Sequence, residues 1–319
     1  GVQTASGVAA EGQLATQTFG LRIGLGPDGF PVRNWVGGIR LNPAGGPITL
    51  MFNRDDVRDT MLSFAGQRDP VSNRVWGGVV SNAFSVLGNW GNEDSGIYAN
   101  FDYQLIRGYD VANNTRFDGS VGNYFRVYAR KEGSLTVGMN LTGMHYDKNL
   151  RYFTFGQGGY FSPQQYFLFN APVRWTGWWR QKLQYSVSGS LGAQHFTEDS
   201  SPYYPIQPPG QPAGPGAATP PSTPGPGRRP ALATTQTSYP AFANTGANYS
   251  LDVRTGYQLT PHWLAEAFVS ANNARDYTAT SAGLGIKYLF DARPLSPDLN
   301  IIAVPDWKGH QPFALISPN

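Results

Sequence analysis

Apolar residues alternate with polar or very small ones through most of this chain, and this two-residue period constrains the fold more than any other feature. One segment reads Phe101, Asp102, Tyr103, Gln104, Leu105. Successive side chains of a β-strand point to opposite faces, so each such segment has an apolar face and a polar face. Many segments of this kind are typical of a membrane barrel with a lipid-facing wall and a wet lumen. The sequence therefore predicts an all-β, transmembrane, antiparallel up-and-down β-barrel.

Composition agrees with a wall that contacts hydrocarbon. Charged residues make up 14% of the 319 residues and aromatic residues 13%, whereas soluble globular chains carry about 25% charged residues. No run of about 18 apolar residues is present, which excludes a helical membrane span. The absence of cysteine fits an exported protein. The net charge of +3 is too small to imply a nucleic-acid partner. The chain opens at Gly1 without a charged-then-apolar leader, which we interpret as a mature or truncated form.

The alternation predicts about twelve strands, an even number as is usual for bacterial barrels. They are 17–25, 33–42, 46–54, 75–90, 95–106, 121–130, 133–147, 164–175, 181–198, 247–259, 262–272 and 277–290. Short connections alternate with mostly longer ones, the long ones being 55–74, 107–120, 148–163 and 199–246. Outer-membrane barrels have short periplasmic turns and longer outer loops, so this alternation sets the expected orientation.

The predicted barrel domain covers 1–290. Within it, segment 202–230 is dense in proline and glycine and is predicted to be an outer loop. Residues 1–16 are small and polar and are predicted to hold the end of a strand. Segment 291–319 contains prolines that break any alternation, and we expect it to form a periplasmic C-terminal tail.

Several local strings resemble one protein family in the same order along the chain. They are Gly156–Gln164 (GQGGYFSPQ), Phe64–Pro70 (FAGQRDP), Trp76–Gly78 (WGG), His145–Lys148 (HYDK), Pro172–Trp175 (PVRW), Gly29–Val32 (GFPV) and Gln3–Gly7 (QTASG). The sequence resembles the C-terminal domain of cellulose synthase operon protein C over nearly its whole length, except about 200–245. The resemblance implies an outer-membrane barrel of about sixteen strands that exports cellulose. It also implies an upstream array of tetratricopeptide repeats, an indirect link through that array to periplasmic and inner-membrane synthase subunits, and about four further strands before Gly1.

Strand parity predicts which polar side chains face the lumen. The candidates are Asp102, Gln104, Arg126, Tyr128, Asn140, Gln184, Gln194, Asp252, Arg254, Glu266 and Lys287. They carry charges of both signs, as expected for the path of a neutral, hydroxyl-rich polymer that needs donors and acceptors spread along it. Ordinary porin polarity is the alternative explanation for any one of them.

The predicted loop 148–163 combines glycines with aromatic residues. We expect it to fold inward and line or gate the exit through Tyr152, Phe155, Gly156, Gly158, Gly159, Tyr160 and Phe161. The alternative is an outer loop packed only on itself.

Two further aromatic patterns lie near predicted strand ends. Trp175, Trp178 and Trp179 flank a periplasmic turn and are typical of an aromatic girdle at the headgroup level. They are alternatively a sugar-stacking platform at the lumen entrance. In the last strand, Gly285, Tyr288 and Phe290 resemble the signal read by the barrel assembly machinery, and this spacing is equally expected of a lipid-facing strand.

The alternation predicts an outer-membrane channel, and the resemblance implies that it carries a linear β-1,4-glucan made by an inner-membrane synthase, with no catalytic residue, metal or cofactor. The histidines at 145, 195, 262 and 310 have no metal-ligand spacing, and no serine elbow motif appears. The alternatives are a general diffusion porin for small solutes, a barrel-type outer-membrane hydrolase, and a non-transporting scaffold with a plugged lumen.

Overall fold

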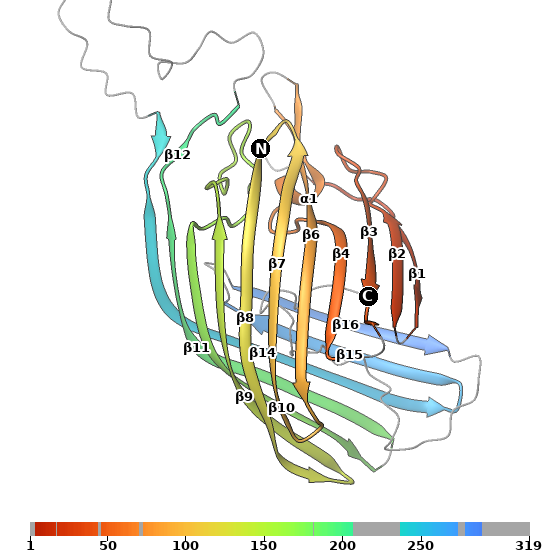
Figure 1. Cartoon of the computed structure of the whole chain (residues 1–319). Helices are drawn as coiled ribbons and strands as arrows, with labels where there is room; N and C mark the ends of the chain where they lie inside the picture. The colour runs from red at the N-terminus through yellow and green to blue at the C-terminus, as the bar shows by residue number, and fades with distance from the viewer. Residues whose placement is uncertain are drawn as a thin grey trace, which may run out of the picture.

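The computed structural model describes residues 4–16, 18–43, 46–69, 73–180, 182–206, 237–273 and 278–288. These residues form an antiparallel β structure with one short helix (Figure 1). The elements are β1 (Ala10–Ala15), β2 (Phe19–Leu25), β3 (Trp35–Leu41), β4 (Ile48–Asp56), α1 (Met61–Ala65), β5 (Gln67–Arg68), β6 (Val75–Gly91), β7 (Ser95–Tyr109), β8 (Val111–Arg130), β9 (Gly133–Tyr146), β10 (Gln165–Trp179), β11 (Leu183–Glu198), β12 (Ser201–Pro202), β13 (Ser238–Tyr239), β14 (Phe242–Thr260), β15 (Trp263–Asn272) and β16 (Ala279–Tyr288).

The main sheet is an up-and-down meander. Its 14 strands follow the order β1-β2-β3-β4-β6-β7-β8-β9-β10-β11-β14-β15-β16, with β5 paired only to β6. Each of the twelve predicted strands is present, and β1 is added before them. Within the described part of the chain β1 and β16 are the two ends of the sheet, since no ladder joins them. The fold class predicted from the alternation is confirmed.

One predicted connection is wrong. Segment 107–120 was expected to be a long loop, but β7 continues to Tyr109 and β8 begins at Val111. The chain reverses at Asp110, whose positive φ of 51° allows a tight turn. Polar residues that stand next to each other in this segment suggest a loop in the sequence. In the structure this segment instead continues β8 and its polar face.

The sheet curls strongly, so that one face is concave. Figure 1 shows the strands passing from β1–β3 through β8 and β11 to β14–β16, which cross behind the others. The outward face carries exposed apolar side chains, among them Leu21, Ile23, Phe52, Ile97, Phe101, Val121, Phe125, Leu141, Phe169, Leu191, Leu251 and Val269. The inward face is mostly polar and buried. This division of the two faces is the arrangement of a barrel wall between lipid and a wet interior.

Tyrosine rings cover glycines on neighbouring strands of the inner face. Tyr98 lies directly opposite Gly122, and Tyr124 lies directly opposite Gly96. A Cβ added at Gly122 would lie 2.2 Å from the Tyr98 hydroxyl oxygen, and one added at Gly96 would lie 2.5 Å from that of Tyr124. The two glycines therefore leave room for rings that shield the backbone and fix the register of β7 against β8.

The two ends of the sheet differ. One end carries the short turns, and the other carries α1, β12 and the longer connections (Figure 1). By the usual asymmetry of outer-membrane barrels we call the second the outer end. No helix in the described part of the chain is long and apolar enough to cross a membrane. Most of the predicted loop 202–230, all of the predicted tail 291–319, and Phe290 lie outside the described residues.

Candidate passage and its outer cap

The concave face is mostly polar along its length. Its buried polar side chains come from β6 through β15 and are Ser85, Asn100, Asp102, Gln104, Asn114, Arg116, Asp118, Ser120, Asn140, Thr142, Asn170, Gln184, Ser186, Ser190, Gln194, Asn248, Asp252, Gln258 and Ser270. Six of the predicted lumen residues belong to this set: Asp102, Gln104, Asn140, Gln184, Gln194 and Asp252. The structure therefore places them on one face, and their contact with a transported molecule stays a prediction.

Hydrogen bonds join these side chains across the strands of the first half. Ser81 donates to Gln104 at 2.7 Å, and Ser85 donates to Asp102 on the same pair of strands. Asn100 in turn donates to Asp102 at 3.1 Å and accepts from Ser120 on β8. The donors and acceptors are thus held in fixed positions by one another, which keeps the surface polar without mobile side chains.

The same face holds charges that the sequence analysis missed. Arg116 and Asp118 form an ion pair on β8 in which the side chains are only 8% and 2% exposed. Asp118 lies directly opposite Asp102 on β7. Arg116 and Asp118 lie in segment 107–120, which was expected to be a loop. The available signal was the continued alternation of polar and other residues through 111–121.

The other predicted charges of the inner face are paired as well. Arg254 Nε donates to Asp252 Oδ1 at 2.9 Å on β14. Lys287 on β16 donates to Glu266 on β15 at 2.8 Å. Arg22 on β2, which the sequence analysis did not single out, forms an ion pair with Asp55 of β4. A face with internally paired charges presents no strong field of one sign.

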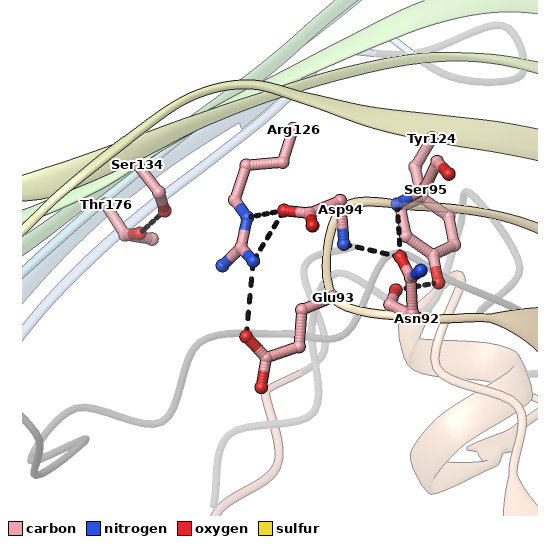
Figure 2. A network of polar contacts seen from close by, with 8 residues as sticks. All are labelled: Asn92, Glu93, Asp94, Ser95, Tyr124, Arg126, Ser134 and Thr176. Carbon is pink, nitrogen blue, oxygen red and sulfur yellow. Dashed lines mark hydrogen bonds and ion pairs between the residues drawn. The ribbon is translucent and has the colours of Figure 1, made fainter.

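Arg126 marks the turn end of this face. Figure 2 shows its guanidinium against the β6–β7 turn, where Nε and Nη2 reach Asp94 at 2.9 and 2.7 Å and Nη2 reaches Glu93 at 3.2 Å. In the same turn Asn92 accepts from the backbone N–H groups of Asp94 and Ser95. The contacts tie β8 to the neighbouring hairpin at the end that we assign to the periplasm.

The placement of Tyr128 among the inward residues is wrong. The ladder between β8 and β9 shifts after Arg126, so that Tyr128 pairs with Leu135. This β-bulge adds one residue to β8 and turns Tyr128 to the outward face, where its side chain is 43% exposed. Parity counting fails here because a bulge moves every later side chain to the other face.

At the outer end, two long connections pack against the concave face and form what we call the outer cap: residues 57–66 with α1, and residues 147–163. Their apolar side chains share a buried cluster with the strands. Its members are Leu62, Trp76, Val79, Ile106, Val111, Ala112, Met144, Tyr146, Leu150, Phe155, Tyr160, Phe161, Tyr166, Leu168 and Phe196. The glycine- and aromatic-rich loop therefore packs against the strands, and its role in lining or gating the exit stays a prediction.

Tyr160 and Phe161 anchor this loop. Tyr160 is 1% exposed, its ring lies 6.0 Å from that of Tyr146, and its hydroxyl oxygen accepts from Asn114 Nδ2 at 3.1 Å. Burial raises the pKa of the Tyr160 phenol, so the hydroxyl stays protonated. The Phe161 ring packs edge-on against Phe196 at 5.0 Å. Both residues thus fix the loop to the inner face of the sheet.

The two connections of the cap also contact each other directly. Thr60 Oγ1 donates to the Gly159 carbonyl at 2.7 Å, and the backbone N–H of Phe161 donates to Asp59 Oδ2 at 3.0 Å. Gly159 has φ of 66°, and an added Cβ would lie 2.9 Å from Thr60 Oγ1 and 3.0 Å from Leu62 Cδ2. The cap is therefore one packed unit in which Gly159 has no room for a side chain.

The remaining predicted gating residues sit in the same unit. Phe155 packs against Trp76 with ring centroids 6.0 Å apart, and Gly156 forms a bridge with Val111. Gly158 leaves space for the neighbouring Tyr160 ring. Tyr152 stacks on Tyr239 with centroids 3.5 Å apart. Gating by these residues stays a prediction.

The three tryptophans near the β10–β11 turn separate into two groups. Trp175 and Trp179 lie on the outward face and are 50% and 57% exposed. Trp178 lies opposite Gln184, a buried residue of the concave face. The girdle interpretation thus fits Trp175 and Trp179, whereas Trp178 is on the side that a sugar-stacking platform requires.

The proposed assembly signal lies partly in β16. Gly285 pairs with Glu266, and Tyr288 pairs with Trp263 on the outward face. The described residues contain no group of three or more histidine, aspartate or glutamate side chains with the spacing of a metal site.

Comparison with known proteins agrees with this geometry. The family model described as "Cellulose synthase operon protein C C-terminus" matches residues 1–291. This chain belongs to that family. Cellulose synthase operon protein C of Xanthomonas axonopodis pv. citri (strain 306) is 35% identical over 293 residues, 91% of this chain and 19% of that protein. A relative of the same name from Komagataeibacter xylinus is 36% identical over 210 residues, 64% of this chain and 16% of that protein.

This chain thus spans about a fifth of the length of the Xanthomonas relative, which it matches over 293 residues. Among solved structures, a bacterial polysaccharide outer membrane secretin aligns with a TM-score of 0.41 and 11% identity, covering 86% of this chain and 84% of that one. The domain is an outer-membrane barrel domain, in keeping with its apolar outward face and polar concave face.

Proposed function

We propose that this domain provides the outer-membrane passage through which a linear β-1,4-glucan, cellulose, leaves the cell. The observation that carries the proposal is the mostly polar inner face from β6 to β15, on a wall whose other face is apolar. Membership of the cellulose synthase operon protein C family supplies the identity of the polymer. The domain itself carries out no reaction and supplies no energy, and the growing chain is pushed by the synthase.

The chemistry of the inner face suits a neutral polymer that must keep moving. A glucan presents hydroxyl groups that both donate and accept, and the face offers serine, asparagine and glutamine side chains along its length. Charges such as Arg254 and Asp252 neutralise each other within the wall. Contacts are therefore many and individually weak, as conduction requires both entry and release.

The outer cap is proposed to control the exit. It lies at the end of the concave face where the polymer would emerge, and Thr60 and Gly159 couple its two connections. In this proposal the cap closes the passage when no polymer is present, and it moves aside as one unit when a chain reaches it.

The proposed partners are those implied by the family. An upstream repeat domain would link the passage indirectly to periplasmic and inner-membrane synthase subunits. Insertion into the membrane would involve recognition of the last strand by the barrel assembly machinery. Two residues of the proposed signal, Gly285 and Tyr288, lie in β16.

A complementation experiment tests the proposal. A cellulose-producing strain is made in which the segment corresponding to 1–290 is deleted from the full-length protein, and extracellular cellulose is measured by cellulase-released glucose. We expect extracellular cellulose to disappear while inner-membrane synthase activity in isolated membranes is retained. Intact deposition by the deletion strain would refute export by this domain.

Trp178 provides a residue-level prediction. Its inward position at the turn end suits stacking on the C–H face of a glucose ring, an interaction of about 0.5–1.5 kcal/mol by analogy with aromatic pairs. In planar bilayers, with the cap opened by Gly159→Val in every protein compared, cellohexaose added on the turn side should block the current of the protein that keeps Trp178 for several times longer than that of the protein with Trp178→Ala. Trp179→Ala is the matched control, because its side chain is outward. Equal blocking times for the three proteins would remove Trp178 from the entrance.

A further inference from the structure

Two arginines stand on the outward face near the outer end of the apolar band. Arg54 lies near the end of β4 and Arg107 near the end of β7, with β6 between them. Arg54 is opposite Asn82 of β6, and Arg107 is opposite Val80 of β6. Each follows an exposed apolar residue at a spacing of two, Phe52 and Leu105, so both side chains point away from the lumen.

The two guanidinium groups have different surroundings. Arg54 lies over the Trp35 ring at 4.5 Å, donates to the Trp35 carbonyl at 3.1 Å and donates to Asn82 Oδ1 at 2.7 Å. Arg107 forms no hydrogen bond or ion pair with any residue that the structure describes. Its positive charge repels that of Arg54. Asn82 thus lies beside two positive charges that repel each other.

Nearby acidic groups do not balance this charge. Asp56 is the carboxylate that interacts with Arg54, and it also faces the positive charge of Arg58. Its Oδ1 accepts from Asn34 Nδ2 at 3.2 Å. Asp56 therefore faces two guanidinium groups and the neighbouring carboxylate of Asp55, which itself pairs with Arg22.

The position of the patch along the strands is that of a lipid headgroup. Toward the turn end the same face carries Phe52 in contact with Phe84 at 4.9 Å, followed by exposed Phe101. Trp35 sits at the level of Arg54, as aromatic residues do at the boundary between hydrocarbon and headgroups. A guanidinium at this boundary is costly without an anion, since little water is available to solvate it.

We propose that Arg54, Arg107 and Asn82 form a binding site for the phosphate of an outer-leaflet lipid. Guanidinium groups bind phosphate oxygens through paired N–H donors, and two guanidinium groups on the same face, one on each side of a single strand, can hold one phosphate between them. Stacking on Trp35 holds Arg54 in place for this contact. The site would fix the height of the wall in the outer leaflet, and it is independent of what passes through the lumen.

The test is retention of lipid A by the full chain. Protein is reconstituted in nanodiscs of phosphatidylcholine containing diphosphoryl lipid A, and native mass spectrometry measures the fraction of released protein that keeps a lipid A molecule. We expect Arg107→Gln to lower the ratio of bound to unbound protein about fivefold, and Arg54→Gln/Arg107→Gln to lower it further. Arg54→Lys/Arg107→Lys should keep part of the retention, because charge remains while the paired donors are lost.

The control is Arg130→Gln. Arg130 also lies over an outward aromatic ring, Tyr128 at 5.8 Å, but at the turn end and without a second arginine beside it. It should retain lipid A as the wild type does. Arg107→Gln removes no contact within the described structure, so it folds as the wild type does. Unchanged retention in the Arg54→Gln/Arg107→Gln variant, or an equal loss in Arg130→Gln, would overturn the proposal.

Discussion

Replacing Gly159 with valine is expected to open the outer end of the passage. Gly159 has φ of 66°, and a side chain there would press on Thr60 and Leu62 in the other half of the cap. The left-handed backbone costs an L-residue about 1–2 kcal/mol, and overpacking adds about 1–3 kcal/mol. Because every 1.4 kcal/mol changes an equilibrium tenfold, the population with a displaced cap should rise by more than about tenfold.

Single-channel recording in planar bilayers measures this effect. The wild-type protein should remain mostly closed, whereas Gly159→Val should show long openings of larger conductance. Gly246→Val is the matched control, since a Cβ at Gly246 meets nothing within 4 Å. If Gly159→Val conducts like the wild type, or if Gly246→Val opens equally, the cap does not close the passage.

The strands could be predicted because the two faces of the sheet meet different solvents. Lipid outside and a polar interior impose the two-residue period on every strand, so the period is written into the sequence even where no single residue is informative. The prediction failed at 107–120, where Asn113 and Asn114 suggest a turn. In the structure Asn114 is 4% exposed and donates to Tyr160. A polar residue that packs beneath a cap and one that sits in an open loop look alike in sequence.

The cap could be predicted only in part. Glycines beside aromatic residues suggested that 148–163 packs inward. They gave no indication of its partner, because Thr60 and Gly159 are 99 positions apart. No local pattern specifies a contact over that separation. The alternation alone could have placed Trp178 on the opposite face from Trp175 and Trp179. Odd-numbered and even-numbered residues of one strand point to opposite faces, and Trp178 is the only even-numbered one of the three. The reversal at Tyr128 was not available, because a bulge leaves no mark on the alternation before it.

Loss of Arg116 is expected to give the largest change in stability on the inner face. Its guanidinium pairs with Asp118 and also lies 5.5 Å from the centroid of the Tyr146 ring. Arg116→Met keeps much of the side-chain volume but leaves Asp118, which lies opposite Asp102, without its cationic partner. Breaking a buried ion pair by removing one partner typically costs about 3–5 kcal/mol. Urea unfolding from lipid vesicles, followed by tryptophan fluorescence, should show a loss of this size at pH 8.

The pH dependence and a matched control distinguish charge from packing. Protonation of Asp118 removes its repulsion with Asp102, so the loss in Arg116→Met should shrink at pH 5. Adding Asp102→Asn should restore stability at pH 8. Arg126→Met breaks a pair with Glu93 and Asp94, whose side chains are 87% and 72% exposed, and should change stability little. A loss in Arg116→Met that is the same at both pH values would show that the side chain acts by packing. In that case Arg116 stabilises the sheet through the packing of its side chain and not through its charge.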